Sequence, residues 1–531
     1  MAYYAIGIGG TGAKCIESLI HLCAAGLMPE PAREQAKELH VMFVDPDQGN
    51  GTLDRAQRVL QEYSTCRRVA AGGIDLFKTP VTVAVPDVWS PFAQETDPKL
   101  EDFYEHNTLE STTPNVAHLF DVLFSHQERD TPLGKGFRGH PAIGAAVLAD
   151  TVDFGSVEPW MTLRSKVAQD AQSGEQAKII LFGSIFGGTG ASGLPTIARL
   201  IKKELAKSKV TANYEISAVT MLPYFSFEQK NDDEMRAQAE NFLINTQAAL
   251  KYYARPYYLD VFDSLYVLGD HVLSPLGPSL RKLRDSGDQI DPKGGKDQLN
   301  EPHFLELYAA LAAIDFFKAV SAKGVNMIAR KEKGVHAWYD VPPVFRRTEL
   351  LDKLDQLTRF AFAYDCTYFP TLESIATRGR PFRAPWYLNL FEGDDFVELS
   401  ESLKNELLKM RDYIRDFLAW EASLQSTAKE VEMQLFNINT FAIKTTIDAK
   451  ETYVLRNPDG FLVEEFANLL LPKGTQNPFA LSNLWERMSD AKIDDVQARG
   501  VGRFINVLYQ QCKTERYFES PTFGKEDSHA Q

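Results

Sequence analysis

Two short glycine-rich segments constrain this chain more than any other feature, because each follows an apolar, strand-like run and precedes a helical pattern. The first is Gly7-Ile8-Gly9-Gly10-Thr11-Gly12, at the end of the run 3–8, and the second is GSIFGGTGASG at 183–193, after the run 178–182. Glycine lets backbone N–H groups approach a phosphate closely, and the N-terminus of a helix adds a partial positive charge. We therefore predict two phosphate loops. The alternative is that the glycines only permit tight turns.

The apolar runs and the helical patterns between them indicate the fold class. Runs that are almost continuously apolar are typical of strands covered on both faces, and their alternation with helices favours a mostly parallel α/β sheet. Residues 52–133 are interpreted as an elaboration on this core, and residues 270–300, rich in Pro, Gly and charge, as a long lid-like loop. The runs lie at 3–8, 40–44, 178–182, 215–222 and 264–268.

The second half of the chain is predicted to be helix-rich. Residues 301–323 are apolar almost all round and predict a buried central helix, with Asn300 as its N-cap and Pro302 in its first turn. The charged stretch 398–436 predicts an amphipathic helix, either with a solvated face or with a partner bound to it. We expect a nucleotide-binding domain at 1–300, the central helix at 301–323, and a divergent, helix-rich α+β region at 324–531.

Composition limits the function classes. A chain of 531 residues is expected to form two or more domains. A formal charge of −15 disfavours direct binding to nucleic acid or anionic lipid. The five cysteines form no CxxC pair, and no apolar run approaches the roughly 20 residues of a membrane-spanning helix. The N-terminus shows no signal-peptide pattern, so we expect a cytoplasmic protein without a transmembrane segment.

The two glycine loops, together with three other segments, resemble the tubulin and FtsZ superfamily. Its signature is a GGGTGSG-type loop around the nucleotide phosphates, and residues 187–193 read GGTGASG, one residue longer than the usual spacing. The other matches follow in the order of the family. They are AIGIGGTGAKCI at 5–16 (first phosphate loop), FVDPDQ at 43–48 (acid-bearing loop), GHPAIG at 139–144 (γ-phosphate segment) and PYFSFE at 223–228 with Arg236 (ribose element).

The resemblance implies a bacterial-type, Rossmann-like GTPase domain that binds GTP or GDP with Mg²⁺ and assembles with copies of itself. Asp45 and Asp47 would hold the metal ion, although aspartates are also common in turns. His140 and Pro141 would face the γ-phosphate. The residues implied to surround the phosphates are Gly9, Gly10, Thr11, Gly12, Gly187, Gly188, Thr189, Gly190, Ala191, Ser192 and Gly193.

The resemblance also implies contacts to the ribose and the base. Glu228 and Arg236 would contact the ribose or the base, or they are solvated charges at the start of a helix. Lys14 stands where the family has an Asn or Asp that accepts hydrogen bonds from guanine, so this position carries a donor. On the central helix, Phe304 would stack on the base and Glu306 would supply an acceptor, unless Glu306 has a structural role.

Hydrolysis in this family needs an acidic loop after the central helix, which each subunit donates to its neighbour's nucleotide. Residues 324–326 resemble the start of that loop, but residues 327–330 lack its two aspartates, which leaves Glu332 and Asp340 as candidate catalytic acids. A self-assembling GTPase is the first hypothesis. The second is a nucleotide-gated adaptor that hydrolyses GTP weakly or not at all, does not polymerise and binds an unidentified partner through its C-terminal region. A dehydrogenase that binds NAD through Gly7–Gly12 and Asp45 is the third.

Overall fold

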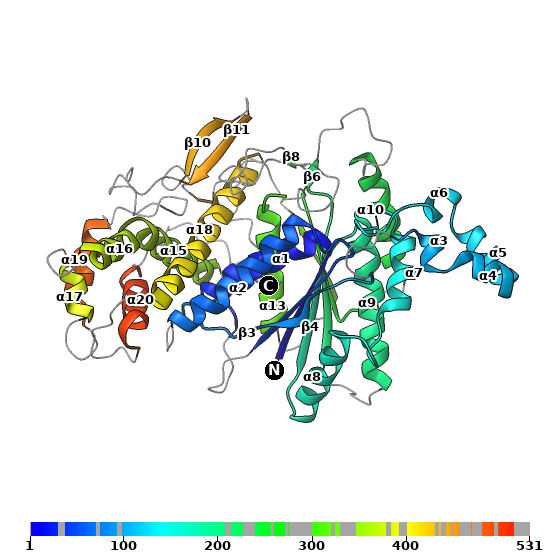
Figure 1. Cartoon of the computed structure of the whole chain (residues 1–531), viewed down its shortest axis with the longest axis horizontal. Coiled ribbons are helices and arrows are strands. Elements are labelled where there is room, and N and C mark those ends of the chain that lie inside the picture. Colours follow the sequence, from blue (N-terminus) through cyan, green and yellow to red (C-terminus); the bar gives the residue numbers. More distant parts are fainter. Residues whose placement is uncertain are drawn as a thin grey trace, which may run out of the picture.

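The structure is a computed structural model with seven parallel strands in one sheet. Their order is β3-β2-β1-β4-β5-β7-β9 (Figure 1). The strands are β1 (Ala2–Ile8), β2 (Leu39–Val44), β3 (Val81–Trp89), β4 (Ala177–Ser184), β5 (Tyr214–Met221), β7 (Ser264–Gly269) and β9 (Gly324–Ala329). The described residues are 2–29, 38–70, 75–92, 98–137, 139–207, 214–226, 239–255, 260–270, 274–275, 300–319, 324–329, 347–378, 384–391, 401–430, 435–436, 442–447, 450–455, 469, 481–492 and 498–513.

The five predicted strand runs coincide with β1, β2, β4, β5 and β7, so the predicted parallel α/β sheet is confirmed. The edge strands β3 and β9 were not predicted. Strand β3 contains Pro86, and most of its residues are half-buried or exposed. Its sequence therefore lacks the continuous run of apolar residues that is typical of a central strand. The prediction that residues 52–133 elaborate on the core was therefore partly wrong, because α2 (Gly51–Ala70) and β3 belong to the core itself.

Helices cover both faces of the sheet. One face packs against α1 (Gly9–Ala24), α2 and α13 (Phe304–Lys318). The other packs against α7 (Pro141–Thr151), α8 (Trp160–Gln172), α9 (Gly188–Lys207) and α10 (Ala239–Tyr253). Between β3 and α7, the short helices α3 (Leu100–Phe103), α4 (His106–Thr112), α5 (Pro114–Leu123) and α6 (His126–Arg129) form an arm that projects from the side of the molecule (Figure 1).

The crossover that contains α13 differs in hand from the other crossovers. The chain steps from β1 to β3 with α1 and α2 on one face, and from β4 to β7 in the opposite direction with α9 and α10 on the opposite face, so these four crossovers share one hand. The step from β7 to β9 continues in the same direction across the sheet as the steps that contain α9 and α10. However, α13 lies on the opposite face of the sheet, together with α1. Its hand is therefore opposite, an uncommon arrangement for parallel strands.

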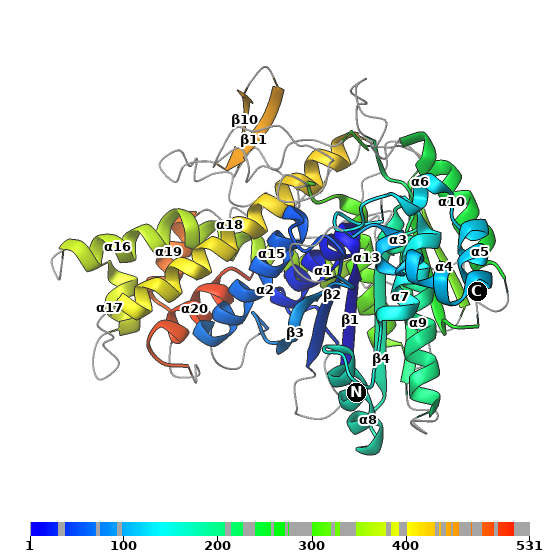
Figure 2. The same cartoon turned by 45° about the vertical axis from the view of Figure 1, so that its right-hand side comes forward.

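The C-terminal helices share a hydrophobic core with the sheet. They are α15 (Arg347–Ala363), a π-helical turn (Tyr364–Tyr368), α16 (Phe369–Arg378), α17 (Pro385–Phe391), α18 (Glu401–Glu430), α19 (Leu481–Ser489) and α20 (Gly500–Gln511). A hairpin of β10 (Ala442–Ile447) and β11 (Lys450–Leu455) follows α18, and β6 (Phe225–Ser226) pairs with β8 (Ser274–Pro275). Figure 2 shows α18 running along α1 and α2.

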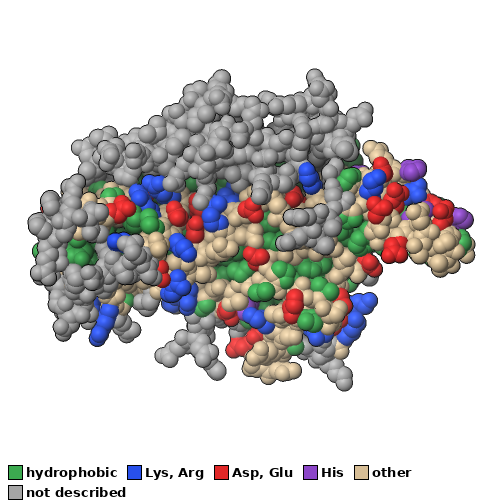
Figure 3. Space-filling model, in the orientation of Figure 1, with side chains coloured by type: hydrophobic (Ala, Val, Ile, Leu, Met, Phe, Trp, Pro, Cys, Tyr) green, Lys and Arg blue, Asp and Glu red, His purple; other side chains and the backbone are tan. Residues whose placement is uncertain are grey.

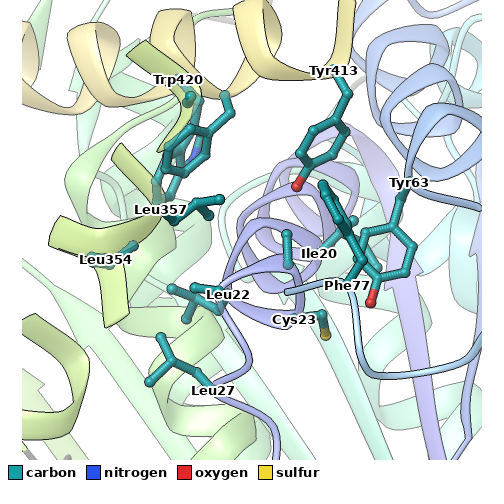
Figure 4. Packing of buried hydrophobic residues seen from close by; sticks show 14 of the residues in the cluster. Ile20, Leu22, Cys23, Leu27, Tyr63, Phe77, Leu354, Leu357, Tyr413 and Trp420 are labelled. Atoms are coloured by element: carbon teal, nitrogen blue, oxygen red, sulfur yellow. The ribbon is translucent and has the colours of Figure 1, made fainter. Parts of the chain in front are cut away.

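Figure 4 shows this shared core at close range. Side chains from α15 and α18 meet those of α1 and α2, among them Leu354, Leu357, Tyr413, Trp420, Ile20 and Tyr63. One side of α18 is therefore buried within the chain. The described helices beyond α13 pack onto the sheet rather than around a separate core.

The surface carries mixed charge. On the face shown in Figure 3, acidic and basic side chains are interspersed, with hydrophobic side chains exposed between them. Within the described residues, no helix combines the length and the apolar character needed to cross a membrane.

Candidate nucleotide site

The two glycine loops meet at the carboxyl ends of β1 and β4, which are neighbours in the sheet. The chain leaves β1 toward β2 on one side, whereas β4 leads to β5 on the other. In open α/β sheets, this reversal point is where ligands bind, because the two adjacent loops separate and leave a crevice. The fold thus brings the two predicted loops to the position that favours a ligand.

Both loops pass directly into helices. Helix α1 begins at Gly9, whose φ of +72° suits glycine, and its N-cap Ile8 provides no capping side chain. Helix α9 begins at Gly188. A Cβ on Gly9 would lie 3.5 Å from Cβ of Thr189, so the two helix starts are in close contact. The first-turn N–H groups of a helix lack partners within it, and two such ends side by side create a cradle suited to an anion.

A third loop completes the cradle. Gly136 and Gly139 both have positive φ, +87° and +80°, and a Cβ on Gly136 would lie 3.7 Å from the Thr189 hydroxyl oxygen. A Cβ on Gly188 would come within 2.9 Å of the backbone nitrogen of Gly139. On the other side, the Asn245 side-chain amide donates to the Gly139 carbonyl at 3.2 Å. The second and third loops therefore approach each other so closely that a side chain at Gly188 would have to displace the backbone of Gly139.

The predicted metal ligands lie beside the first loop. Ile8 and Val44 are register partners, so Asp45 follows β2 next to the point where Gly9 follows β1. Asp45 and Asp47 are buried, and a carboxylate oxygen of Asp45 accepts from the Asp47 backbone N–H at 3.1 Å. Burial, together with the charge of Asp47, raises the pKa of Asp45 to about 8. A cation would offset this cost of burying two carboxylates.

Two carboxylates suit Mg²⁺ only if phosphate and water supply the other ligands, which is the usual arrangement for this ion. Within the described part of the chain, no group of three or more His, Cys, Asp or Glu side chains gathers as a ready metal site. Asn50 lies at the same edge, because a Cβ on Gly10 would be 3.4 Å from its amide nitrogen. The residues present fit a metal ion held jointly with a nucleotide.

Five of the predicted phosphate residues, Gly12, Gly190, Ala191, Ser192 and Gly193, are packed inside the protein. A Cβ on Gly12 would lie 2.6 Å from the Phe182 carbonyl oxygen, and one on Gly193 would lie 2.6 Å from the Ile8 side chain. The Ser192 hydroxyl donates to the Gly188 carbonyl at 2.7 Å, and the Ala191 carbonyl accepts from Tyr253 at 2.9 Å. Their contacts hold α1 and α9 close to the strands. Gly10, Thr11, Gly187 and Thr189 are the partly exposed members of the two loops.

His140 and Pro141 stand at the start of α7, next to the third loop. The His140 backbone N–H donates to the Phe137 carbonyl at 2.8 Å, and Nδ1 of its half-exposed ring lies 3.5 Å from a Glu128 carboxylate oxygen of the arm. Pro141 is the first residue of the helix. This segment connects the cradle to the arm.

Lys14 and Glu306, both predicted to contact the base, form a buried ion pair. Their side chains are 2% and 0% exposed, and the Lys14 Nζ lies 2.5 Å from the Glu306 Oε1. Lys14 also donates to the Glu301 carbonyl at 3.2 Å. Glu306 accepts from the Tyr224 hydroxyl at 2.6 Å and from the His303 N–H at 2.9 Å. The donor at position 14 is therefore matched by an acceptor from α13.

The same contacts determine where α13 begins. His303 is the N-cap of the helix and shares a capping box with Glu306, so the prediction of Asn300 as N-cap was wrong. The Asn300 carbonyl instead accepts from Arg55 of α2 at 2.7 Å. Phe304, predicted to stack on the base, is 1% exposed, and its N–H donates to Thr427 of α18 at 3.2 Å.

Tyr224 lies between this ion pair and the first loop, because burial and Glu306 raise the pKa of its hydroxyl while the neighbouring Thr11 side chain lowers it. Sequence reasoning missed it as a site residue, as it missed Asn50, Asn245 and Gly136. For Gly136, the neighbouring Gly134 and Gly139 were a local signal. For Tyr224 the signal was its place in the segment 223–228 that resembles the ribose element, although its partner Glu306 lies 82 residues away. For Asn245 there was none, because its partner Gly139 lies 106 residues away.

The remaining predicted residues lie outside the described part of the chain. They are Glu228, Arg236, Glu332 and Asp340. Residues 324–326, which resemble the start of the acidic loop, instead open the strand β9 and pair with β7.

The buried carboxylate of Asp45 predicts an unusual pH dependence of stability. The pKa of Asp45 is about 8 in the folded chain, against an ordinary value of 3.8. Between these two pH values, the folded state therefore keeps a proton that the unfolded state has lost. In this pH range, the free energy of unfolding falls by about 1.4 kcal/mol for each unit by which the pH rises. We expect Asp45→Asn to raise the free energy of unfolding at pH 8, with a gain that shrinks as the pH approaches 4. Urea denaturation at several pH values tests this, and a gain independent of pH would contradict it.

The Lys14–Glu306 pair predicts a non-additive pair of substitutions. Lys14→Met leaves a buried carboxylate without its cation and should lower the free energy of unfolding by about 3–5 kcal/mol. Adding Glu306→Gln removes that charge and should recover part of the loss. A double-mutant cycle measured by urea denaturation checks this, with exposed Lys203→Met as a matched control. Additive losses would show that the two side chains are not coupled.

Comparisons with known proteins leave the family open. No protein-family model matches the chain, and no curated protein matches it. The features of the chain that point to a function are the glycine segments, their convergence in the fold and the chemistry of the residues around them.

Proposed function

We propose that this chain binds GTP together with Mg²⁺, with the nucleotide phosphates at the starts of α1 and α9. The observation that carries the proposal is the meeting of two glycine-rich helix starts at the reversal point of a parallel sheet, beside two buried carboxylates. A glycine-rich turn or a buried aspartate by itself can be purely structural. Together they supply donors for phosphate oxygens and ligands for the cation that accompanies them.

Each group has a role in this proposal. Backbone N–H groups of the two loops, with the Thr11 and Thr189 hydroxyls, donate to phosphate oxygens. Asp45 and Asp47 hold Mg²⁺, directly or through water. The Lys14–Glu306 ion pair fixes the start of α1 relative to α13, so the first loop keeps its shape before the nucleotide arrives.

By resemblance, the protein belongs among the tubulin/FtsZ-like GTPases that assemble with copies of themselves. A non-polymerising adaptor with weak or absent hydrolysis is the second candidate, and one observation favours it. The segment expected to begin the acidic loop is strand β9, and residues 324–329 contain no acid. Without a positioned acid, the attacking water loses an important source of activation.

A dinucleotide-binding enzyme is the third candidate, because Asp45 directly follows β2. In dinucleotide-binding folds an acid at this place binds the adenosine ribose. The second glycine loop argues against this candidate, because it brings a second glycine-rich helix start into contact with the first.

Nucleotide competition tests the proposal and separates it from the dinucleotide-binding candidate. Fluorescent GTP is titrated with and without Mg²⁺ and competed with GTP, ATP and NAD. We expect GTP to compete best and Mg²⁺ to strengthen binding. Gly10→Glu, at a position whose Cβ would have the Asn50 side chain as its nearest neighbour, should weaken binding on the order of 100-fold, because it places a carboxylate among the phosphates.

Ala206→Glu is the matched control, because it adds the same charge at an exposed position near the far end of α9. It should bind like the wild type. Competition by NAD alone, or equal affinity of the wild type and Gly10→Glu, would overturn the proposal.

Pelleting distinguishes the assembling GTPase from the adaptor. A self-assembling GTPase should sediment in the presence of GTP and Mg²⁺ and release phosphate at a rate that rises with protein concentration. Nucleotide binding without sedimentation or phosphate release would instead support the adaptor.

A further inference from the structure

A cavity of about 240 Å³ lies over the β1–β2–β3 part of the sheet, away from the glycine loops. Its floor includes Tyr4 and Ile6 of β1 with His40 and Met42 of β2, and α8 forms a wall. Tyr4 and His40 are register partners four residues before the ends of their strands. At roughly 3.3 Å per residue, the polar end of the cavity is about 13 Å from the cradle. It is therefore a second site rather than part of the first.

The polar end of the cavity is organised by hydrogen bonds. The Lys166 Nζ lies 3.1 Å from Nδ1 of His40, and Nε2 of the same ring lies 3.4 Å from a Glu38 carboxylate oxygen. A lysine ammonium only donates, so Nδ1 accepts and Nε2 carries the hydrogen that faces Glu38. Burial and the charge of Lys166 lower the pKa of His40, which agrees with a neutral ring.

Tyr4 completes this arrangement from β1. Its ring stacks on His40 with centroids 4.8 Å apart, and its hydroxyl donates to Asp170 at 2.5 Å. The carboxylates of Asp170 and Glu38 thus stand behind Tyr4 and His40 and are not among the residues that line the cavity. Of the described lining residues, Lys166 alone carries a fixed charge, and it is positive.

The rest of the lining is mostly apolar, with Met42, Ala84 and Leu163 among its members. A concave, mainly apolar site with a few convergent polar groups is the usual form of a small-molecule site. The volume lies below the roughly 300–1,000 Å³ of pockets for drug-sized ligands. The space therefore suits a body of one or two fused rings, or an aliphatic chain of similar volume.

We propose that this cavity binds a small amphipathic anion, with its apolar body on the sheet and its carboxylate or similar head at Lys166. The head accepts hydrogen bonds from the ammonium, which His40 holds in place. This site is independent of the proposed nucleotide site, since it shares no lining residue with the glycine loops.

The test compares two probes of the same shape, 2-naphthoate and its neutral analogue 2-naphthamide, by isothermal titration calorimetry on the full chain. We expect the wild type to bind the carboxylate about tenfold more tightly than the amide. Lys166→Met should remove that preference, lowering naphthoate affinity about tenfold and leaving naphthamide affinity unchanged. Lys203→Met, an exposed lysine of α9, should bind both probes as the wild type does.

A blocking variant shows where the probes bind. Ala84→Trp fills the cavity from β3 and should abolish binding of both probes, and Thr162→Trp, at an exposed position of the α8 wall, serves if Ala84→Trp does not fold. No naphthoate binding at millimolar concentration, equal affinities for the two probes, or binding that survives the blocking variant would overturn the proposal. GTP binding should be unchanged in Lys166→Met, so the proposal for this cavity can fail without affecting the proposed nucleotide site, and the reverse.

Discussion

The burial of α1 on every side is the constraint on which the rest of the structure depends. Of its 16 residues, 14 are buried between the sheet, α2, α13 and α18, and four of these are polar or charged. Each polar side chain meets a partner from another helix: Lys14 meets Glu306, Glu17 meets Arg55, Ser18 meets Trp420 and His21 meets Tyr413. Because an unpaired charge in such a place is costly, these contacts favour one arrangement of four helices.

This arrangement matters for function because α1 starts in the cradle. The helix cannot shift at its N-terminus without disturbing the polar contacts along its length. Just after the first glycine loop, Lys14 pairs with Glu306 at the start of α13, and Glu306 also accepts from Tyr224. The donors of the loop are therefore held in position, and a preorganised site binds an anion without a further ordering cost. The buried carboxylate of Asp45 lies beside this rigid element, where a bound cation would relieve the cost of its burial.

Sequence reasoning succeeded where the signal is local. Central strands are buried on both faces, so their apolar runs identify them directly, and glycines at the ends of β1 and β4 indicate close backbone approach. It failed at β3, whose exposed positions and Pro86 hide an edge strand. It also treated the two residues separately, Lys14 as a donor at the base position and Glu306 as either a base acceptor or a structural acid, because nothing in the sequence shows that residues 292 positions apart face each other.

By itself, the sequence determined the parallel α/β sheet and the two glycine-rich helix starts, because strand burial and backbone freedom at glycine are properties of short segments. Only the tertiary structure decided that these starts touch, that Gly136, Asn50 and Asn245 join them, and that α13 crosses to the face of α1. It also decided that the C-terminal helices complete the core of the sheet instead of forming their own. The reason is that these outcomes depend on packing and on buried polar partners contributed by segments far apart in the chain.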